Sequence, residues 1–410
     1  MYIKRKIEGK ILKYIDSPEI IAIVGPRQCG KTTLLLRAFQ SLRTGAGEFI
    51  SFEDQKILGM FENNLDDFIG IYVKGKEYLF IDEFQYAKNG GKKLKYIFDL
   101  HKIKIFISGS SAIDLTVNAL KFLVGRIFIF NLYPLDFGEF LDYKDRKYSE
   151  QLENCRQSFG NSMPSKIGGE IHDKLSKYYE EYVLFGGYPR VVLADSAEEK
   201  KEVLRNIYNT YFLREVRDIL GLIDDYKLSK LIKALAFQIG NLIEYKELSL
   251  VSEYAYPTLK KYLNFLEKTF ICDFVKPYFK NKRVEIVKNP KVYFLDTGLR
   301  NLIVNDFRGL NDRPDAGALL ENAVFQQIIK NGWQANYWRS KKQYEMDFVL
   351  FLENRVELAL EVKNYLNKTA SASLSNFKAT HPDIKINFIY RNIDPKVDAK
   401  NVLTFPVYAI

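Results

Sequence analysis

The chain of 410 residues is long enough for several domains, each with its own hydrophobic core. Hydrophobic residues make up 47% of it and charged residues 27%, a composition that excludes an intrinsically disordered protein, and no apolar run approaches the length of a membrane span. The formal charge of +10 favours a polyanionic partner such as nucleic acid, while three scattered cysteines and three histidines argue against a disulfide framework or a histidine metal site.

The N-terminal residues carry charges where a signal peptide has its apolar core, so we expect a cytoplasmic protein without membrane contact. A short apolar strand is then predicted at Ile20–Val24, followed by a glycine-containing loop and a helical pattern. The loop matches the P-loop pattern in the strand–loop–helix context that it requires. Its N–H groups would surround the phosphates of ATP, Lys31 would reach the terminal phosphates, and Thr32 would hold Mg²⁺. The expected nucleotide-binding residues are Gly25, Pro26, Arg27, Gln28, Cys29, Gly30, Lys31, Thr32 and Thr33.

A second apolar strand, Tyr78–Ile81, delivers two carboxylates to its end. A carboxylate at the end of a parallel strand beside a P-loop can support Mg²⁺, and a second one can polarise the attacking water. We assign Asp82 to the metal and Glu83 to the water, and a structural acid pair is the alternative. A later strand ends in small polar residues, of which Ser110 is expected to sense the γ-phosphate.

Five segments together resemble a widespread archaeal and bacterial family of AAA-type ATPases: GPRQCGKTT, IDEFQYA, ISGSSAIDL, LVGRIFIFNLYPLDFGEFL and YVLFGGYPRVV. Arg126 falls on a family arginine that could act as a phosphate-sensing finger, because a guanidinium meets phosphate oxygens in a fork. The alternative is a surface arginine that starts a strand. Pro189 resembles the proline that packs on adenine in related switch-type ATPases, and a plain turn between two helices is its alternative.

Three predicted helices followed by a basic hairpin, within residues 226–289, indicate a winged helix. Its recognition helix is expected at Pro257–Thr269, and the hairpin would be the wing. Contacts to phosphates would make DNA binding weaken with salt. A protein-docking module with solvated lysines is the alternative. The residues expected to contact DNA are Lys260, Lys261, Lys280, Lys282 and Arg283.

The last segment, residues 290–410, carries a second set of charged residues. Glu321 lies in a helical pattern, Asp347 in a strand, and Glu361 and Lys363 two apart in the next strand, where they face the same side. Carboxylates and an ammonium group that converge can bind a divalent ion and orient a water. The set resembles the PD-(D/E)xK nuclease core, which implies that Glu321, Asp347 and Glu361 hold Mg²⁺ and that Lys363 assists cleavage. A structural role, or a DNA-binding domain without cleavage, is the alternative.

The predicted fold is α/β throughout. It consists of a P-loop domain with a parallel sheet (1–141), a linker and helical lid (142–225), a winged helix (226–289) and a restriction-endonuclease-like domain (290–410). We expect a magnesium-dependent ATPase that acts on duplex or branched DNA. The alternatives are a switch-type signalling or defence ATPase with a catalytically silent C-terminal recruiter, and a DNA motor, which would need a hexameric ring. A homo-oligomer is compatible with all three.

Overall fold

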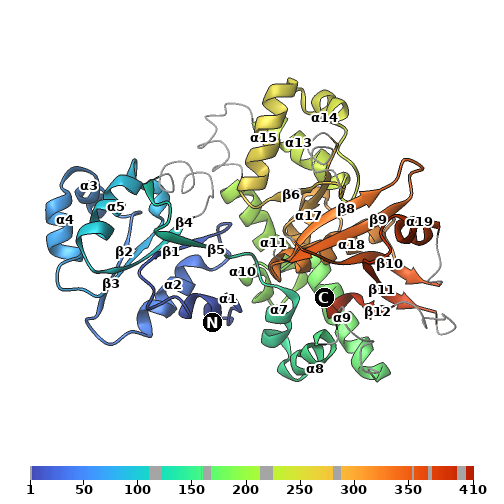
Figure 1. The fold of residues 1–410 in the computed structure, drawn as a ribbon, viewed down its shortest axis with the longest axis horizontal. Helices are drawn as coiled ribbons and strands as arrows, with labels where there is room; N and C mark the ends of the chain where they lie inside the picture. Colours follow the sequence, from blue (N-terminus) through green and yellow to red (C-terminus); the bar gives the residue numbers. More distant parts are fainter. Residues whose placement is uncertain are drawn as a thin grey trace. The chain divides into compact units, whose positions relative to one another are not determined.

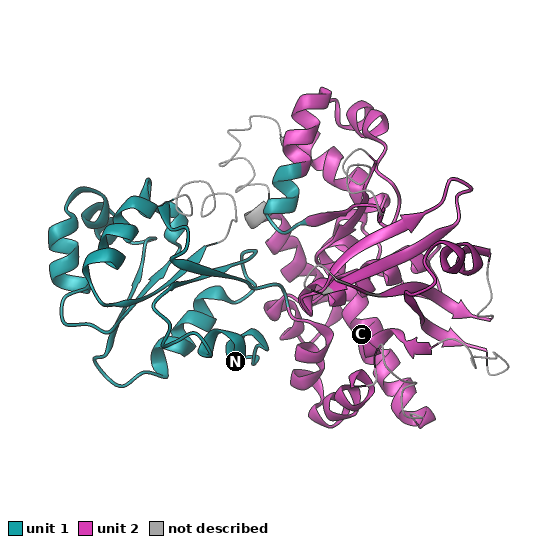
Figure 2. Ribbon diagram, in the orientation of Figure 1, with its two compact units in different colours: residues 1–134, 264–271 teal, residues 135–263, 272–410 magenta. Residues whose placement is uncertain are grey.

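The computed structural model describes residues 2–109, 122–157, 159, 168–212, 225–279, 288–352, 355–367, 372–394 and 403–410 (Figure 1). It divides into two compact units (Figure 2): unit 1 contains residues 1–134 and 264–271, and unit 2 contains residues 135–263 and 272–410. The domain boundary expected at residue 141 falls inside a helix of unit 2, α7 (Phe137–Lys144). The four-domain division stays a prediction.

Unit 1 is built on a five-stranded parallel sheet in the order β2-β3-β4-β1-β5. All five carboxyl ends therefore meet at one edge, and β4 separates β1 from β3. The strands are apolar on both faces, as expected of a parallel sheet covered on both sides. The strands are β1 (Ile20–Val24), β2 (Gly47–Ser51), β3 (Tyr78–Asp82), β4 (Lys104–Gly109) and β5 (Ile127–Asn131).

Two hydrophobic clusters cover this sheet because alternate residues of each strand point to opposite faces. Ile21 and Ile23 belong to one cluster, in which the rings of Phe80 and Phe106 stack with centroids 4.5 Å apart. The even residues of β1 belong to the other cluster. The helices of unit 1 are α1 (Ile7–Leu12), α2 (Lys31–Gln40), α3 (Gln55–Asn63), α4 (Leu65–Tyr72), η1 (Phe84–Tyr86) and α5 (Gly90–Leu100).

Unit 2 begins with helices. A capping box of Asp136 and Glu139 starts α7, which satisfies backbone N–H groups that the first helical turn leaves free. A second group of three helices ends in the antiparallel pair β6 and β7. These elements are α8 (Arg146–Arg156), α9 (Gly169–Phe185), α10 (Pro189–Val192), α11 (Ala197–Asn206), η4 (Ile207–Phe212), α13 (Asp225–Phe237), α14 (Tyr245–Ser252), α15 (Tyr256–Lys268), β6 (Cys272–Val275) and β7 (Lys291–Phe294).

A mixed five-stranded sheet forms the rest of unit 2, in the order β12-β11-β10-β9-β8. Strands β8, β9 and β10 pair antiparallel, whereas β10, β11 and β12 pair parallel, with α19 in the crossover from β10 to β11. The elements are α17 (Thr297–Val304), α18 (Ala316–Lys330), β8 (Gln334–Arg339), β9 (Glu345–Leu352), β10 (Arg355–Leu366), α19 (Ala372–Thr380), β11 (Lys385–Ile393), β12 (Leu403–Pro406) and η5 (Val407–Ala409).

Within the described ranges, none of the helices has the length and apolar character needed to cross a membrane.

Candidate functional site

The predicted P-loop lies between β1 and α2, at the carboxyl edge of the parallel sheet. Gln28 and Gly30 adopt the left-handed backbone conformation, with φ of 57° and 99°, which turns the chain sharply into the helix. Such turns expose successive backbone N–H groups to an anion. Gly25 is required by space, since a Cβ there would lie 2.0 Å from the carbonyl oxygen of Leu132. The loop geometry therefore fits the phosphate-binding role expected of it.

Two side chains of α2 meet the loop and the neighbouring acid. The Lys31 ammonium donates to the carbonyl oxygens of Gly25 and Pro26, each at 2.9 Å, and only 4% of the residue is exposed. The Thr32 hydroxyl donates to Oδ2 of Asp82 over 2.7 Å. The two residues expected to hold Mg²⁺ thus lie within hydrogen-bond distance of each other, although β4 separates β3, which ends at Asp82, from β1, which leads into the P-loop.

The acid pair at the end of β3 is organised by Ser108. Its hydroxyl donates to Oδ1 of Asp82 and accepts from the backbone N–H of Glu83, which lies 3.1 Å away. Glu83 itself is left-handed, with φ of 54°, and Gln85 donates to its carboxylate. Of the small polar residues at the end of this strand, Ser108 among them, sequence reasoning selected Ser110, which lies outside the described residues. The signal was present, because Ser108 is the first polar residue after the apolar run of β4.

Arg5 is a residue that sequence reasoning missed. Its guanidinium donates to the carbonyl oxygen of Cys29 at 2.9 Å and to that of Tyr133 at 2.7 Å, and 6% of the residue is exposed. It therefore braces the P-loop against the segment after β5. An arginine in a basic N-terminal stretch carries no sequence signal for such a role. Burial also raises the pKa of the Cys29 thiol, which keeps it protonated within the loop.

The structure corrects the expectation for Arg126. Parallel pairing of β5 with β1 places Ile127 beside Ile20, so Arg126 lies at the amino edge of the sheet. The P-loop follows the other end of β1, about 17 Å away along five strand residues. The Nε group of Arg126 donates to Asp99 over 2.9 Å. Arg126 therefore lies away from the P-loop of its own chain, directly before β5, and the position excludes a finger role toward that P-loop.

Pro189 is the first residue of α10 in unit 2, in a turn that follows α9. Gly186 in this turn is left-handed, with φ of 78°, and the N–H of Gly187 donates to the buried carboxylate of Asp296 at 2.8 Å. Asp296 also caps α17, as its position after a strand predicts. The segment thus connects two helices, α9 and α10, and the adenine contact of Pro189 stays a prediction.

The charged residues predicted in the C-terminal segment lie together in unit 2. Lys363 donates to Oε1 of Glu361 at 2.6 Å, and the N–H of Val362 donates to Oδ2 of Asp347 at 2.7 Å. Glu361 is 7% exposed, and no hydrogen-bond partner of its Oε2 is found among the described residues. Strands β9 and β10 thus bring Asp347, Glu361 and Lys363 to one place.

Glu321 has partners that the sequence did not reveal. The ammonium of Lys291 lies 3.1 Å from Oε1 of Glu321 and also pairs with Glu345, and the hydroxyl of Tyr293 donates to the same Oε1. Lys291 and Tyr293 come from β7, which begins two residues after the segment expected to form the winged helix. A lysine in a basic hairpin is ordinarily solvated, so its burial beside two glutamates has no sequence signature.

Burial and crowding of negative charge shift the titration of this acidic cluster. Burial, followed by the charge of Asp347, raises the pKa of Glu321 to about 7 and that of Glu361 to about 8, and burial raises that of Asp347 as well. Burial alone would lower the pKa of Lys291, but Glu321 and other nearby carboxylates outweigh it and raise it. In the part of the chain that the structure describes, no three His, Cys, Asp or Glu side chains are grouped closely enough to hold a metal ion.

Of the residues expected to contact DNA, Lys260 and Lys261 are exposed on α15. The Lys260 ammonium lies 4.7 Å from the centroid of the Tyr256 ring, a cation–π contact on the same helix. Lys280, Lys282 and Arg283 lie outside the described residues.

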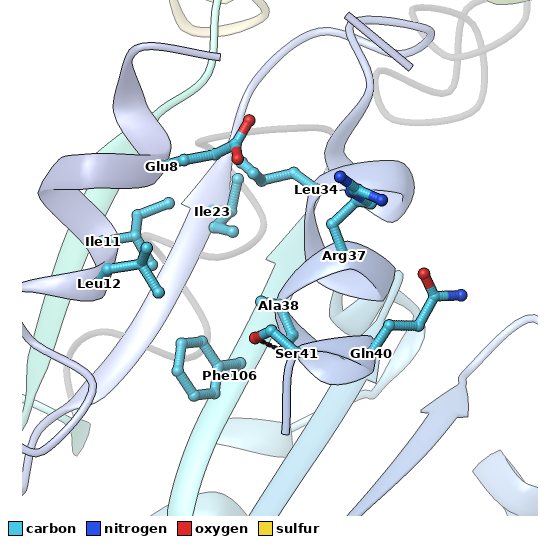
Figure 3. Close-up of a pocket in the computed structure, with 10 residues that line it drawn as sticks. All are labelled: Glu8, Ile11, Leu12, Ile23, Leu34, Arg37, Ala38, Gln40, Ser41 and Phe106. Carbon is cyan, nitrogen blue, oxygen red and sulfur yellow. Dashed lines mark hydrogen bonds between the residues drawn. The ribbon is translucent and has the colours of Figure 1, made fainter. Parts of the chain in front are cut away.

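A separate cavity of about 290 Å³ lies between α1 and α2 (Figure 3). Ile23 and Phe106 line it from the sheet, and Glu8 and Arg37 line it from the two helices. Among the described residues, none of those predicted to bind nucleotide lines it.

Three segments of the chain match known domain families. Residues 17–141 match the AAA domain, which confirms the resemblance to AAA-type ATPases for this segment. Residues 176–310 match a domain of unknown function (DUF8612), and residues 316–408 match another (DUF4143).

Relatives of similar length occur in archaea and bacteria. An uncharacterised protein of Methanocaldococcus jannaschii is 25% identical over 97% of this chain and 85% of its own length. An uncharacterised protein of Haemophilus influenzae is 26% identical over 88% of this chain and 87% of its own length. Among solved structures, the ADP form of the Aeropyrum pernix ORC2 protein is 12% identical, with a TM-score of 0.34 over 75% of this chain and 96% of that one. That TM-score is too low to compare the two sites residue by residue.

Proposed function

We propose that this protein is a magnesium-dependent ATPase of the AAA type that acts on DNA through the second half of its chain. The observation that carries the ATPase part is the convergence of Lys31, Thr32 and Asp82 beside the left-handed P-loop turn. A match to the AAA domain over residues 17–141 supports it independently.

Each residue of the nucleotide site has a distinct task in this proposal. Bound Mg²⁺ would neutralise part of the charge on the phosphates. Thr32 and Asp82, already joined at 2.7 Å, would hold the ion from two elements of the sheet edge. Lys31 would exchange its loop carbonyl acceptors for phosphate oxygens, and Glu83 would orient the attacking water and accept its proton. Ser108 would fix Glu83 through the backbone N–H.

Features of unit 2 support the DNA part. Helices α13, α14 and α15 followed by β6 and β7 have the order of a winged helix, with α15 as the recognition helix and its lysines exposed. Asp347 and Glu361 on neighbouring strands, with Lys363 beside them, fit a nuclease-like core. The net charge of +10 would strengthen binding to a phosphate backbone.

A second candidate, a switch-type ATPase with a catalytically silent nuclease-like domain, is favoured by one observation. The ammonium of Lys291 already pairs with Glu321, one of the three carboxylates to which the resemblance assigns the metal ion, and with the neighbouring Glu345.

The ATPase proposal is tested by ATP turnover of the purified protein. Lys31→Ala should lose nucleotide binding. Glu83→Gln should bind ATP but hydrolyse it at least about 100-fold more slowly than wild type. Lys56→Ala, an exposed lysine of α3, serves as the control and should behave as wild type. Unchanged turnover in both site variants would overturn the proposal.

DNA action is tested by gel shifts with duplex, single-stranded and four-way DNA, with and without ATP, at two salt concentrations. Lys260→Ala together with Lys261→Ala should weaken binding and reduce its salt dependence. No binding to any of these DNAs would favour the second candidate.

A further inference from the structure

Strand β7 sends two side chains into the acidic cluster of unit 2. Lys291 and Tyr293 are two residues apart, so both point to the same side of the strand. Both contact Oε1 of Glu321, and Lys291 also pairs with Glu345. The side chain of Lys291 is 3% exposed, and Tyr293 is fully buried. This is a built ion-pair site and not a chance surface contact.

The surroundings of Glu321 leave little room for another ligand. Gly240, left-handed with φ of 72°, lies so close that a Cβ there would be 3.3 Å from Oε2 of Glu321. The next residue, Asn322, accepts from the N–H of Phe294 at 2.8 Å and donates to its carbonyl oxygen at 2.7 Å. Helix α18 and strand β7 are thus bonded directly beside Glu321, which holds Lys291 and the carboxylate together.

The two halves of the cluster differ in charge balance. Glu321 and Glu345 face Lys291 and Arg339, which lies 3.7 Å from Glu345, so two negative charges meet two positive ones.

Lys363 pairs with Glu361. Asp347 is influenced by Lys291, which already pairs with Glu321 and Glu345, and more weakly by Lys363. The pairing of Leu360 with Phe348 places Glu361 across from Asp347 on the adjacent strand. Among the described residues, Oε2 of Glu361 is buried without a hydrogen-bond partner. A buried carboxylate oxygen in this state costs free energy unless a proton or a cation satisfies it.

We infer that Lys291 is the built-in counter-ion of Glu321 and Glu345, and that the acidic cluster binds one divalent cation, at Asp347 and Glu361, with Glu321 outside its ligand set. This rests on the nuclease-like site of the proposed function. It departs from the three-carboxylate set that the resemblance implies, and it makes Lys291 the residue that sets how many cations the cluster accepts.

The test counts Mn²⁺ bound to the full chain in the absence of nucleotide, by electron paramagnetic resonance of free Mn²⁺. All variants carry Asp82→Asn, which removes the predicted metal carboxylate of the P-loop. We expect one Mn²⁺ per chain, an affinity at least tenfold weaker in Glu361→Gln, and an affinity within twofold of the parent in Glu321→Gln. Lys291→Met should admit a second Mn²⁺, whereas Lys291→Arg should keep one.

Two ions or none in the parent, or a tenfold loss in Glu321→Gln, would overturn the inference. Because Glu321→Gln leaves Lys291 paired with Glu345, that variant decides the question even where Lys291→Met does not fold. ATP turnover and DNA binding are read separately in the protein with Asp82 intact, so a chain that hydrolyses ATP and binds DNA but takes up no Mn²⁺ refutes this inference alone.

Discussion

The bonds between Asn322 and Phe294 allow one sharp prediction of stability. Asn322 is fully buried and is the side-chain acceptor for the N–H of Phe294, whereas the carbonyl oxygen of Phe294 also accepts from Gln326 at 3.1 Å. Asn322→Leu keeps the number of side-chain heavy atoms and the branch at Cγ but leaves that N–H unpaired in the interior. An orphaned buried N–H costs about 1–3 kcal/mol, so we expect the variant to lose about 2 kcal/mol of unfolding free energy.

Gln326→Met is the matched control. The substitution removes the Gln326 amide that donates to the carbonyl oxygen of Phe294, but this oxygen still accepts from Asn322. It also removes Oε1 of Gln326, for which the described residues offer no hydrogen-bond partner. Its cost should stay below about 1 kcal/mol, because neither backbone group of Phe294 loses its last partner.

Urea unfolding followed by tryptophan fluorescence measures both variants. Trp333 and Trp338 are the two tryptophans of the chain and both belong to unit 2, so the signal reports on that unit. With an m-value of about 3 kcal/mol/M, Asn322→Leu should lower the midpoint by about 0.7 M urea. Equal or larger loss in Gln326→Met would refute the reasoning that the orphaned N–H dominates.

Three further predictions concern nucleotide binding, turnover and pH. Gly25→Ala would place a methyl group 2.0 Å from the Leu132 carbonyl oxygen and should weaken binding of a fluorescent ATP analogue at least tenfold. Gly9→Ala, whose methyl group would meet no described atom within 4 Å, should bind normally. Ser108→Ala should lower kcat about tenfold with little change in KM, because it frees the N–H that positions Glu83. An equal loss in Ser41→Ala, whose hydroxyl donates to the Ala38 carbonyl, would contradict this. In EDTA, the unfolding free energy of unit 2 should fall from pH 5 to pH 8, because burial raises the pKa of Glu321 to about 7 and that of Glu361 to about 8. Over this range the folded state retains protons that the unfolded state releases. Glu361→Gln should flatten this pH dependence, and an unchanged slope, measured by tryptophan fluorescence, would contradict the prediction.

Sequence reasoning succeeded where a residue's role depends on chain-local geometry. The order strand, glycine loop, helix was sufficient to place Lys31 and Thr32, and a strand that ends in two acids was sufficient to place Asp82 beside them. The spacing of Glu361 and Lys363 on one strand predicted their contact in the same way. These signals are local because the period of a strand or helix fixes which side chains share a face.

It failed where a role depends on which distant segments meet. Arg126 matched a family position, but strand pairing puts it at the edge of the sheet away from the P-loop. Arg5 and Lys291 resemble ordinary surface cations in the sequence, and only the fold shows that they are buried against a loop carbonyl or a glutamate. Charge type and spacing say nothing about such long-range partners, since any lysine in a basic stretch is by default solvated.

The contacts that Lys291 and Tyr293 of β7 make with Glu321 affect which fragments of this chain can be studied in isolation. Residues 316–408 match one family and residues 176–310 another, so a natural place to cut would fall between α17 and α18. A fragment that begins at residue 316 would contain Glu321 but not Lys291 and Tyr293, which contact it in the intact chain. The Glu321 carboxylate would then be exposed to water and able to bind any available cation. Metal affinity measured on such a fragment would describe a different protein from the intact one.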